Sequence, residues 1–234
     1  MSESPRVFLV IPTRGNRDDT LLPLLDLGLP TVLVHTVPDM LNAPPMSPEY
    51  AGKHIEYLQV SQFPVNISRW WNAGTGRAKE LGADTCVIMN DDVECRDAGS
   101  VRTLGVAASG GLSYVYPRTT PGWTPITGWC FGIDPRLIFP DESYSFWCGE
   151  DDMYIRAGNG GLRLTGVAFP DGADAPIRHL RSEHYSRDEL HGDLGLQALI
   201  DHDIALFGSR WGSRGAAMHT AEDWHVYGGV QDPP

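Results

Sequence analysis

The sequence predicts an α/β fold in which helices flank a mostly parallel central sheet. Between residues 7 and 89, short β-rich runs alternate with segments of helical periodicity, and the first run, residues 7–11, is apolar throughout. A continuous apolar pattern is typical of strands that are buried on both faces, as in parallel sheets whose connecting helices cover both sides. The 234 residues suffice for one large domain with its own core.

The first β-α-β unit is complete by residue 36. Residues 7–11 (Val-Phe-Leu-Val-Ile) indicate a buried strand that Pro12 closes. Asp18 or Asp19 can then cap a helix that runs to about Leu27, where a following glycine ends it. Residues 31–36 form the second predicted strand.

The next unit predicts two more strands with a helix between them. Residues 38–52 are rich in Pro, Met and Asn and are expected to form a loop, and residues 55–60 and 85–89 are the strands. The intervening helix carries apolar or small residues in steps of four and three, which lie on one stripe, and Gly82 ends it: Ile67, Trp71, Gly74, Ala78 and Leu81.

The second half is less regular. We expect a strand at 126–133 with a Gly-Trp break, a helix at 150–157 and a strand at 162–169. The expected division is one domain at 1–206, with a first half at about 1–95 and a second half at about 96–206. A C-terminal tail at 207–234 is expected to be a lid or an oligomer arm.

Composition limits the possible functions. The formal charge of −12 argues against unspecific binding to a phosphate backbone, and it suits a site that gathers carboxylates around a cation. No apolar run reaches the ~20 residues of a membrane span, and no secretory signal is seen. The four cysteines form no C-x-x-C pair, so we expect free thiols in a cytoplasmic protein rather than a disulfide or a zinc site.

Three polar segments follow predicted strands: 12–14 (Pro-Thr-Arg), 35–39 and 90–92 (Asn-Asp-Asp). Ligands of open α/β sheets bind beyond the carboxyl ends of the strands, so these segments should meet at one edge. The Thr13–Arg17 turn is neither a dinucleotide fingerprint nor a P-loop, although a helix N-terminus with an arginine can still receive an anion.

The acidic turn at residues 90–92 is the leading metal-site candidate. Adjacent carboxylates repel one another, and a divalent cation such as Mg²⁺ or Mn²⁺ that bridges to a diphosphate offsets the repulsion. The alternative is an acidic turn that caps a helix near Asp97. His179, or alternatively His184, could supply a further ligand, while Arg178 and Arg181 could instead face phosphate.

A second acidic cluster, Glu150-Asp151-Asp152, opens a predicted helix after an aromatic stretch. Acids are favoured in a first helical turn for structural reasons alone. The functional alternative is a carboxylate that takes a proton from an attacking hydroxyl, with the aromatic neighbours raising its pKa.

Taken in order, these motifs resemble the GT-A glycosyltransferases, especially family-2-like enzymes such as rhamnosyltransferases. The matching stretches span residues 7 to about 186: Val10–Arg14, Arg69–Asn72 with Gly74 and Ala78, Ile88–Val93, Thr127–Cys130, Phe139–Glu142, and Gly149–Asp152 with Arg156 and Gly160-Gly161. The resemblance also implies that the domain at 1–206 is catalytic, with a nucleotide-binding half at about 1–95, an acceptor half at about 96–206, and a small antiparallel subsheet on the acceptor side.

The resemblance implies roles for individual residues. Asp92 would be the direct metal ligand, with His179 as the late metal-binding histidine. Asp151 would be the base, while Glu150 or Asp152 would position the acceptor or a loop. Met153 stands where the family often has a further Asp, which leaves the roles of Asp151 and Asp152 exchangeable. The implied donor contacts are Pro12, Thr13, Arg14, Asp39, Asn72, Asn90, Asp91 and Trp129, the last of which could instead contact the acceptor.

The expected reaction is metal-dependent, inverting transfer of a sugar from a UDP-, GDP- or dTDP-sugar to an acceptor hydroxyl. The acceptor is left open among a glycan, a protein and a modified nucleobase, and the oligomeric state is also open. The alternatives are a nucleotidyltransferase or sugar-nucleotide pyrophosphorylase, and a nucleotide-sugar-binding module without catalysis.

Overall fold

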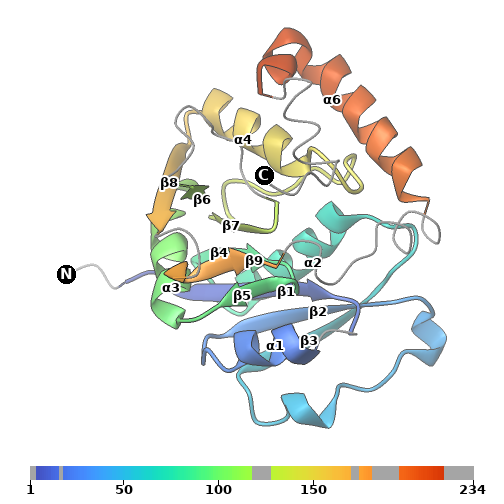
Figure 1. The fold of residues 1–234 in the computed structure, drawn as a ribbon, viewed down its shortest axis with the longest axis vertical. Helices are drawn as coiled ribbons and strands as arrows, with labels where there is room; N and C mark the ends of the chain where they lie inside the picture. The colour runs from blue at the N-terminus through green and yellow to red at the C-terminus, as the bar shows by residue number, and fades with distance from the viewer. Residues whose placement is uncertain (1–3, 16–17, 118–127, 170–173, 181–194, 219–234) are drawn as a thin grey trace.

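The computed structural model describes residues 4–15, 18–117, 128–169, 174–180 and 195–218. Its centre is a seven-stranded mixed sheet with the strand order β3-β2-β1-β4-β7-β6-β8 (Figure 1). The predicted α/β class with a mostly parallel sheet is confirmed. The strands are β1 (Val7–Thr13), β2 (Thr31–Val37), β3 (Ile55–Ser61), β4 (Thr85–Met89), β6 (Gly111–Pro117), β7 (Cys130–Ile133) and β8 (Arg163–Phe169).

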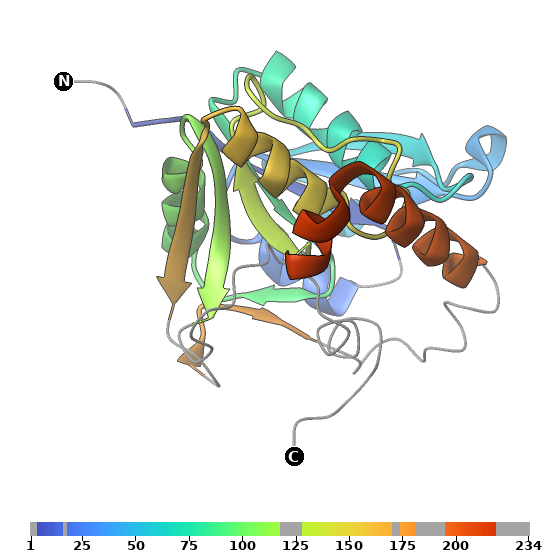
Figure 2. The same ribbon diagram turned by 90° about the horizontal axis from the view of Figure 1, so that it is seen from above.

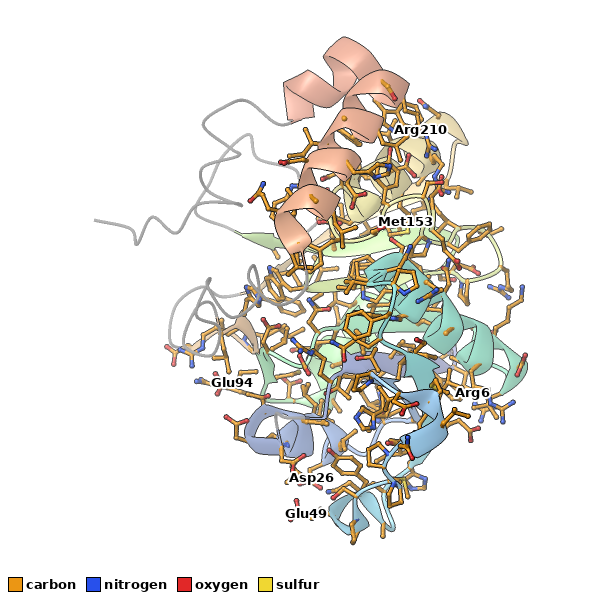
Figure 3. The ribbon with its side chains drawn as sticks, turned by 90° about the vertical axis from the view of Figure 1, so that its right-hand side faces the viewer. Arg6, Asp26, Glu49, Glu94, Met153 and Arg210 are labelled. Atoms are coloured by element: carbon orange, nitrogen blue, oxygen red, sulfur yellow. The ribbon has the colours of Figure 1, made fainter. Side chains whose placement is uncertain are left out.

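The first four strands pair in parallel, so their carboxyl ends share one edge of the sheet. β1 pairs with both β2 and β4, and β2 pairs with β3. Every residue of β1 and β4 is buried, as the continuous apolar runs predict. In Figure 3, Arg6, which precedes β1, and Glu94, which follows β4, lie at opposite ends of the parallel strands.

Antiparallel pairing begins at β7, which lies against both β4 and β6. This strand is shorter than the predicted 126–133, because Gly128 and Trp129 form a turn ahead of it and residues 126–127 lie outside the described part. A separate two-stranded antiparallel sheet joins β5 (Val93–Cys95) to β9 (Ile177–His179). The expected small antiparallel subsheet is therefore present.

Helices cover both faces of the sheet. α1 (Asp18–Leu25) and α3 (Ala98–Ala107) pack with the core on one face, and α2 (Ile67–Glu80) and α4 (Gly149–Asn159) with the core on the other. Gly74 allows α2 to approach the sheet closely, since a Cβ there would lie 2.4 Å from Cγ1 of Val10. Residues 38–52 contain only the short turns η1 (Met40–Asn42) and η2 (Pro48–Tyr50).

The last described element, α6 (Leu196–Met218), bends at Gly212 and lies beside α4 (Figures 1 and 2). The expected domain boundary at 206/207 falls inside this helix, and Phe207 is buried against Tyr144. All four cysteine side chains are buried and free. None of the helices in the described residues combines the length and apolar character that a membrane span requires.

Candidate active site

The acidic turn after β4 is fixed by backbone hydrogen bonds. The Asn90 N–H donates to the Trp129 carbonyl (3.0 Å), and the Val93 N–H donates to the Asn90 carbonyl (3.3 Å). The Thr20 hydroxyl, in the first turn of α1, donates to the Asp91 carbonyl. The segment after β1 and the segment after β4 therefore meet at one edge of the sheet, as predicted. The alternative for this turn was that it caps the helix near Asp97. The cap of α3 is instead Asp97 itself, which accepts from the Ser100 N–H (2.8 Å).

Asp92 and His179 lie together although 87 residues separate them. The antiparallel register pairs Val93 with His179, and the Leu180 N–H donates to the Asp92 carbonyl (2.9 Å). His179 Nε2 lies 3.0 Å from Asp92 Oδ2. The Trp129 indole stacks on the His179 ring, with centroids 5.3 Å apart and planes at 3°. The two residues expected to bind metal are thus side by side on rigid backbone.

The residue types of this pair suit a divalent cation. His179 Nε2 and Asp92 Oδ2 are at hydrogen-bond distance, and two ligands at right angles, each about 2.1 Å from an octahedral ion, would lie about as far apart. Within the described residues, Asp92 Oδ1, His179 Nδ1 and Asn90 Oδ1 are buried without a hydrogen-bond partner. No group of three or more His, Cys, Asp or Glu side chains that could hold a metal occurs in that part of the chain. An ion here would complete its shell with ligand oxygens and water. His184 lies outside the described residues.

The edge beside β1 and β2 contains the first predicted donor residues. Pro12 and Thr13 are buried and Arg14 is exposed. The Thr36 hydroxyl donates to the Thr13 carbonyl (3.2 Å), which joins the two strand ends. Gly15, at a φ of +76°, lies against the imidazole of His35, where a Cβ would be 2.5 Å from Nε2.

His35 begins the polar segment 35–39 that was expected at this edge, although no individual role was assigned to it. Its Nδ1 bonds the Tyr57 hydroxyl, whose oxygen lies 3.5 Å from Gln59 Nε2. Burial lowers the pKa of His35 and thus favours the neutral ring, partly offset by a hydrogen bond to the Arg14 backbone. The parallel register of β1, β2 and β3 brings these side chains together, and only that register could have revealed them.

Asp39 and Asn72, which were also expected to contact the sugar donor, make hydrogen bonds within the protein. Asp39 is exposed and caps η1, accepting from the Leu41 N–H (2.9 Å). The side-chain bond from Asn42 is the largest cause that lowers the pKa of Asp39, followed by the Leu41 N–H. Asn72 donates from Nδ2 to the Pro140 carbonyl and to the Glu142 carboxylate, both at 2.9 Å. Asn72 therefore anchors the segment before α4.

The three carboxylates that open α4 have different surroundings. Asp152 is fully buried and accepts from Arg156 Nε (2.6 Å), Trp211 Nε1 (2.9 Å) and Arg210 Nη1 (3.2 Å). Both of its oxygens therefore bind neighbouring side chains. Asp151 is buried, and Glu150 is half-buried.

Glu150 lies against the backbone that leads to the metal-site candidate. A Cβ added to Gly128 would be 2.6 Å from Glu150 Oε1, and the next residue, Trp129, stacks on His179. Burial, followed by the negative charge of Asp151, raises the pKa of Glu150 to about 8. The Gly128-Trp129 turn therefore lies against Glu150 at Gly128 and against the His179 ring at Trp129.

Together, the sheet order and this acidic edge define a GT-A fold, which the sequence motifs predicted. No protein-family model and no curated protein matches the sequence. Among solved structures, residues 1–349 of S. aureus TarS superpose with a TM-score of 0.51 at 11% identity, over 94% of this chain and 77% of that chain. The longer S. aureus TarS structure gives a TM-score of 0.54 at 9% identity, over 94% of this chain and 45% of that chain.

GalNAc-T7, solved with UDP, GalNAc and Mn²⁺, gives a TM-score of 0.51 at 11% identity. That similarity covers 72% of this chain and 45% of GalNAc-T7. At such identities the similarity establishes the fold of the chain.

Proposed function

We propose that this chain is a metal-dependent glycosyltransferase that moves a sugar, with inversion, from a nucleoside-diphosphate sugar to an acceptor hydroxyl. The observation that carries the proposal is the Asp92–His179 pair at the carboxyl end of β4, which the Gly128-Trp129 turn connects to Glu150 of α4. A cation site beside a buried acidic pair provides what glycosyl transfer needs: charge for the departing diphosphate and a proton acceptor for the hydroxyl.

Asp92 and His179 would hold Mn²⁺ or Mg²⁺ through one carboxylate oxygen and one imidazole nitrogen. When bound, the ion would neutralise the charge of the leaving diphosphate as a Lewis acid. The presence of UDP and Mn²⁺ in the GalNAc-T7 structure supports this choice of ligands. For the donor, we propose contacts from the β1 end (Pro12, Thr13 and Arg14), from Asp39 and Asn72, and from the acidic turn itself (Asn90 and Asp91). The donor nucleotide is proposed among UDP, GDP and dTDP.

Asp151 is the proposed base. Burial, followed by the negative charge of Asp151, raises the pKa of Glu150 to about 8, so Glu150 already carries a proton at neutral pH and cannot accept another. Asp152 has both oxygens bound to Arg156, Arg210 and Trp211, which makes it the least suitable of the three acids to receive a proton. A protonated Glu150 can donate a hydrogen bond that orients the acceptor. Inversion needs one base and no covalent intermediate.

The test is product analysis with Mn²⁺ and a panel of UDP-, GDP- and dTDP-sugars. Thermal stabilisation first identifies the bound donor, because a ligand of the folded state raises its stability by mass action. Release of a nucleoside diphosphate, lost in both Asp92→Asn and Asp151→Asn, is the expected result. Glu94→Gln is the matched control, since Glu94 is close in sequence but pairs with Arg178 on the β5–β9 sheet.

Two results would contradict the proposal. Release of pyrophosphate would indicate a nucleotidyltransferase. Donor binding without turnover of donor, with any acceptor or with water, would indicate a binding module.

A further inference from the structure

Helix α6 holds the start of α4 through a buried carboxylate. Asp203 is fully buried, and its Oδ2 accepts from the backbone N–H groups of Phe146 (2.7 Å) and Trp147 (2.8 Å). His202 Nδ1 lies 3.1 Å from its other oxygen. A buried carboxylate needs such partners, and these two are backbone groups directly ahead of the Glu150-Asp151-Asp152 turn.

A second contact of α6 lies one turn further along α4. Arg210 and Trp211 both donate to Asp152, and Arg210 also donates to Asp141 at 2.6 Å. Figure 3 shows Arg210 on α6 above Met153 of α4. An apolar cluster that includes Tyr144, Cys148 and Phe207 fills the space between the two helices. The start of α4 is therefore fixed from outside by another helix.

Cys148 is the link between the clamped backbone and Glu150. It is the N-cap of α4, it makes no side-chain capping bond, and it has left-handed backbone angles (φ 58°, ψ 0°). It is the one residue other than glycine with a positive φ among the described residues. Left-handed angles are unfavourable for a residue with a Cβ, and surrounding structure must hold them. The hydrogen bonds of Asp203 to the two preceding residues supply that restraint.

We propose that Asp203 is a positioning residue for the α4 carboxylates, which makes α6 part of the catalytic apparatus. By holding Phe146 and Trp147, Asp203 fixes the left-handed turn at Cys148 and thereby the start of α4, from which Glu150 reaches Gly128. This inference rests on the proposed function for its kinetic readout. The geometry of the clamp itself is independent of that function.

The kinetic test compares Asp203→Ala with Asp203→Asn. The alanine variant should lower kcat by about 100-fold or more, because a misplacement of about 1 Å has that effect on catalysis, while the donor KM stays within about threefold. The asparagine variant retains an oxygen that can accept both N–H groups and should stay within about fivefold of the parent. Asp201→Ala is the control, since Asp201 is exposed on the same helix and bonds only Gln197 among the contacts described (2.8 Å). A loss of kcat in Asp203→Asn equal to that in Asp203→Ala would overturn the inference, as would no loss in either.

A second pair of variants isolates the backbone angle at Cys148. Cys148→Gly and Cys148→Ala remove the same sulfur, but only glycine adopts left-handed angles without cost. In the Asp203→Ala background, the glycine variant should have a kcat about 5- to 30-fold above the alanine variant, equivalent to about 1–2 kcal/mol. Equal rates would contradict the proposed link. If Asp203→Ala does not fold, Asp203→Glu displaces the acceptor by one methylene and serves in its place.

Hydrogen exchange separates failure of this inference from failure of the proposed function. The amide hydrogens of residues 146–152 should lose protection in Asp203→Ala and keep it in Asp203→Asn, whether or not the protein transfers sugar. Unchanged protection in Asp203→Ala would overturn the clamp. Absence of any sugar-nucleotide turnover in the parent protein, with the exchange result as expected, would overturn only the proposed function.

Discussion

Replacing Glu150 with glutamine should change how the stability of the protein depends on pH. The folded protein holds the pKa of Glu150 at about 8, whereas an unperturbed glutamate titrates near 4.5, and burial followed by the charge of Asp151 causes the difference. Between these pH values the folded state keeps a proton that the unfolded chain has released. The contribution of Glu150 to the free energy of unfolding therefore falls as the pH rises from 4.5 to about 8.

The magnitude follows from the size of the perturbation. Each pH unit in the range costs up to about 1.4 kcal/mol. Because Glu150 is half-buried as a residue, solvent reduces the total, and we expect on the order of 2–4 kcal/mol by pH 8. Glutamine has nearly the same shape and no charge, so Glu150→Gln should match the parent below about pH 4.5 and become progressively more stable than it toward pH 8.

Urea unfolding at pH 5, 6, 7 and 8 measures this difference, since a change of midpoint at constant m-value reports stability alone. Other groups titrate in both proteins and cancel in the comparison. Glu80→Gln is the matched control, because Glu80 is exposed on α2 and pairs with Arg77 at the surface. A difference that does not vary with pH, or a Glu150→Gln variant less stable than the parent at pH 8, would refute the assigned environment of Glu150.

Two further predictions concern packing. Gly74→Ala should destabilise the protein by about 1–3 kcal/mol, because its Cβ would lie 2.4 Å from Val10 on the sheet. Gly76→Ala, on the same helix with nothing within 4 Å of its Cβ, should instead stabilise by about 0.5–1 kcal/mol; equal effects in thermal unfolding would contradict the packing of α2. Trp129→Ala should weaken Mn²⁺ binding about 10- to 100-fold, because it releases the His179 ring. Trp129→Phe, which keeps an aromatic ring, should retain most of the affinity. A loss of affinity of equal size in both variants would rule out stacking as the cause.

The first half of the fold could be predicted because its signals are local. β4 begins and ends where its apolar run does, and α2 follows its stripe of apolar and small residues. β6 was missed because its run of Leu, Ser, Tyr and Val lies in a stretch where Gly, Trp and Pro are frequent, which is typical of irregular structure. α6 was missed because its apolar residues have little helical periodicity, and its contacts with α4 stabilise it instead.

The residue types of the site could be predicted from the sequence, but the contacts that these residues make with one another could not. The carboxylates at 90–92 and 150–152 are visible in the sequence as acidic clusters beside strand and helix ends. That His179 would face Asp92 depends on the pairing of β5 with β9, two three-residue strands separated by residues 96–176. Likewise, the binding of Asp152 to Arg210 and Trp211 could not be predicted without α6.

The most direct test of the central claim is a titration of Mn²⁺ followed by electron paramagnetic resonance, with and without the nucleoside diphosphate of the donor. The account predicts one ion per chain that binds far more tightly with the nucleotide than without it, because the pair supplies two protein ligands and the diphosphate supplies others. Asp92→Asn and His179→Ala should each abolish this binding, and Glu94→Gln should not. Binding of Mn²⁺ that is unchanged in both variants would contradict the account.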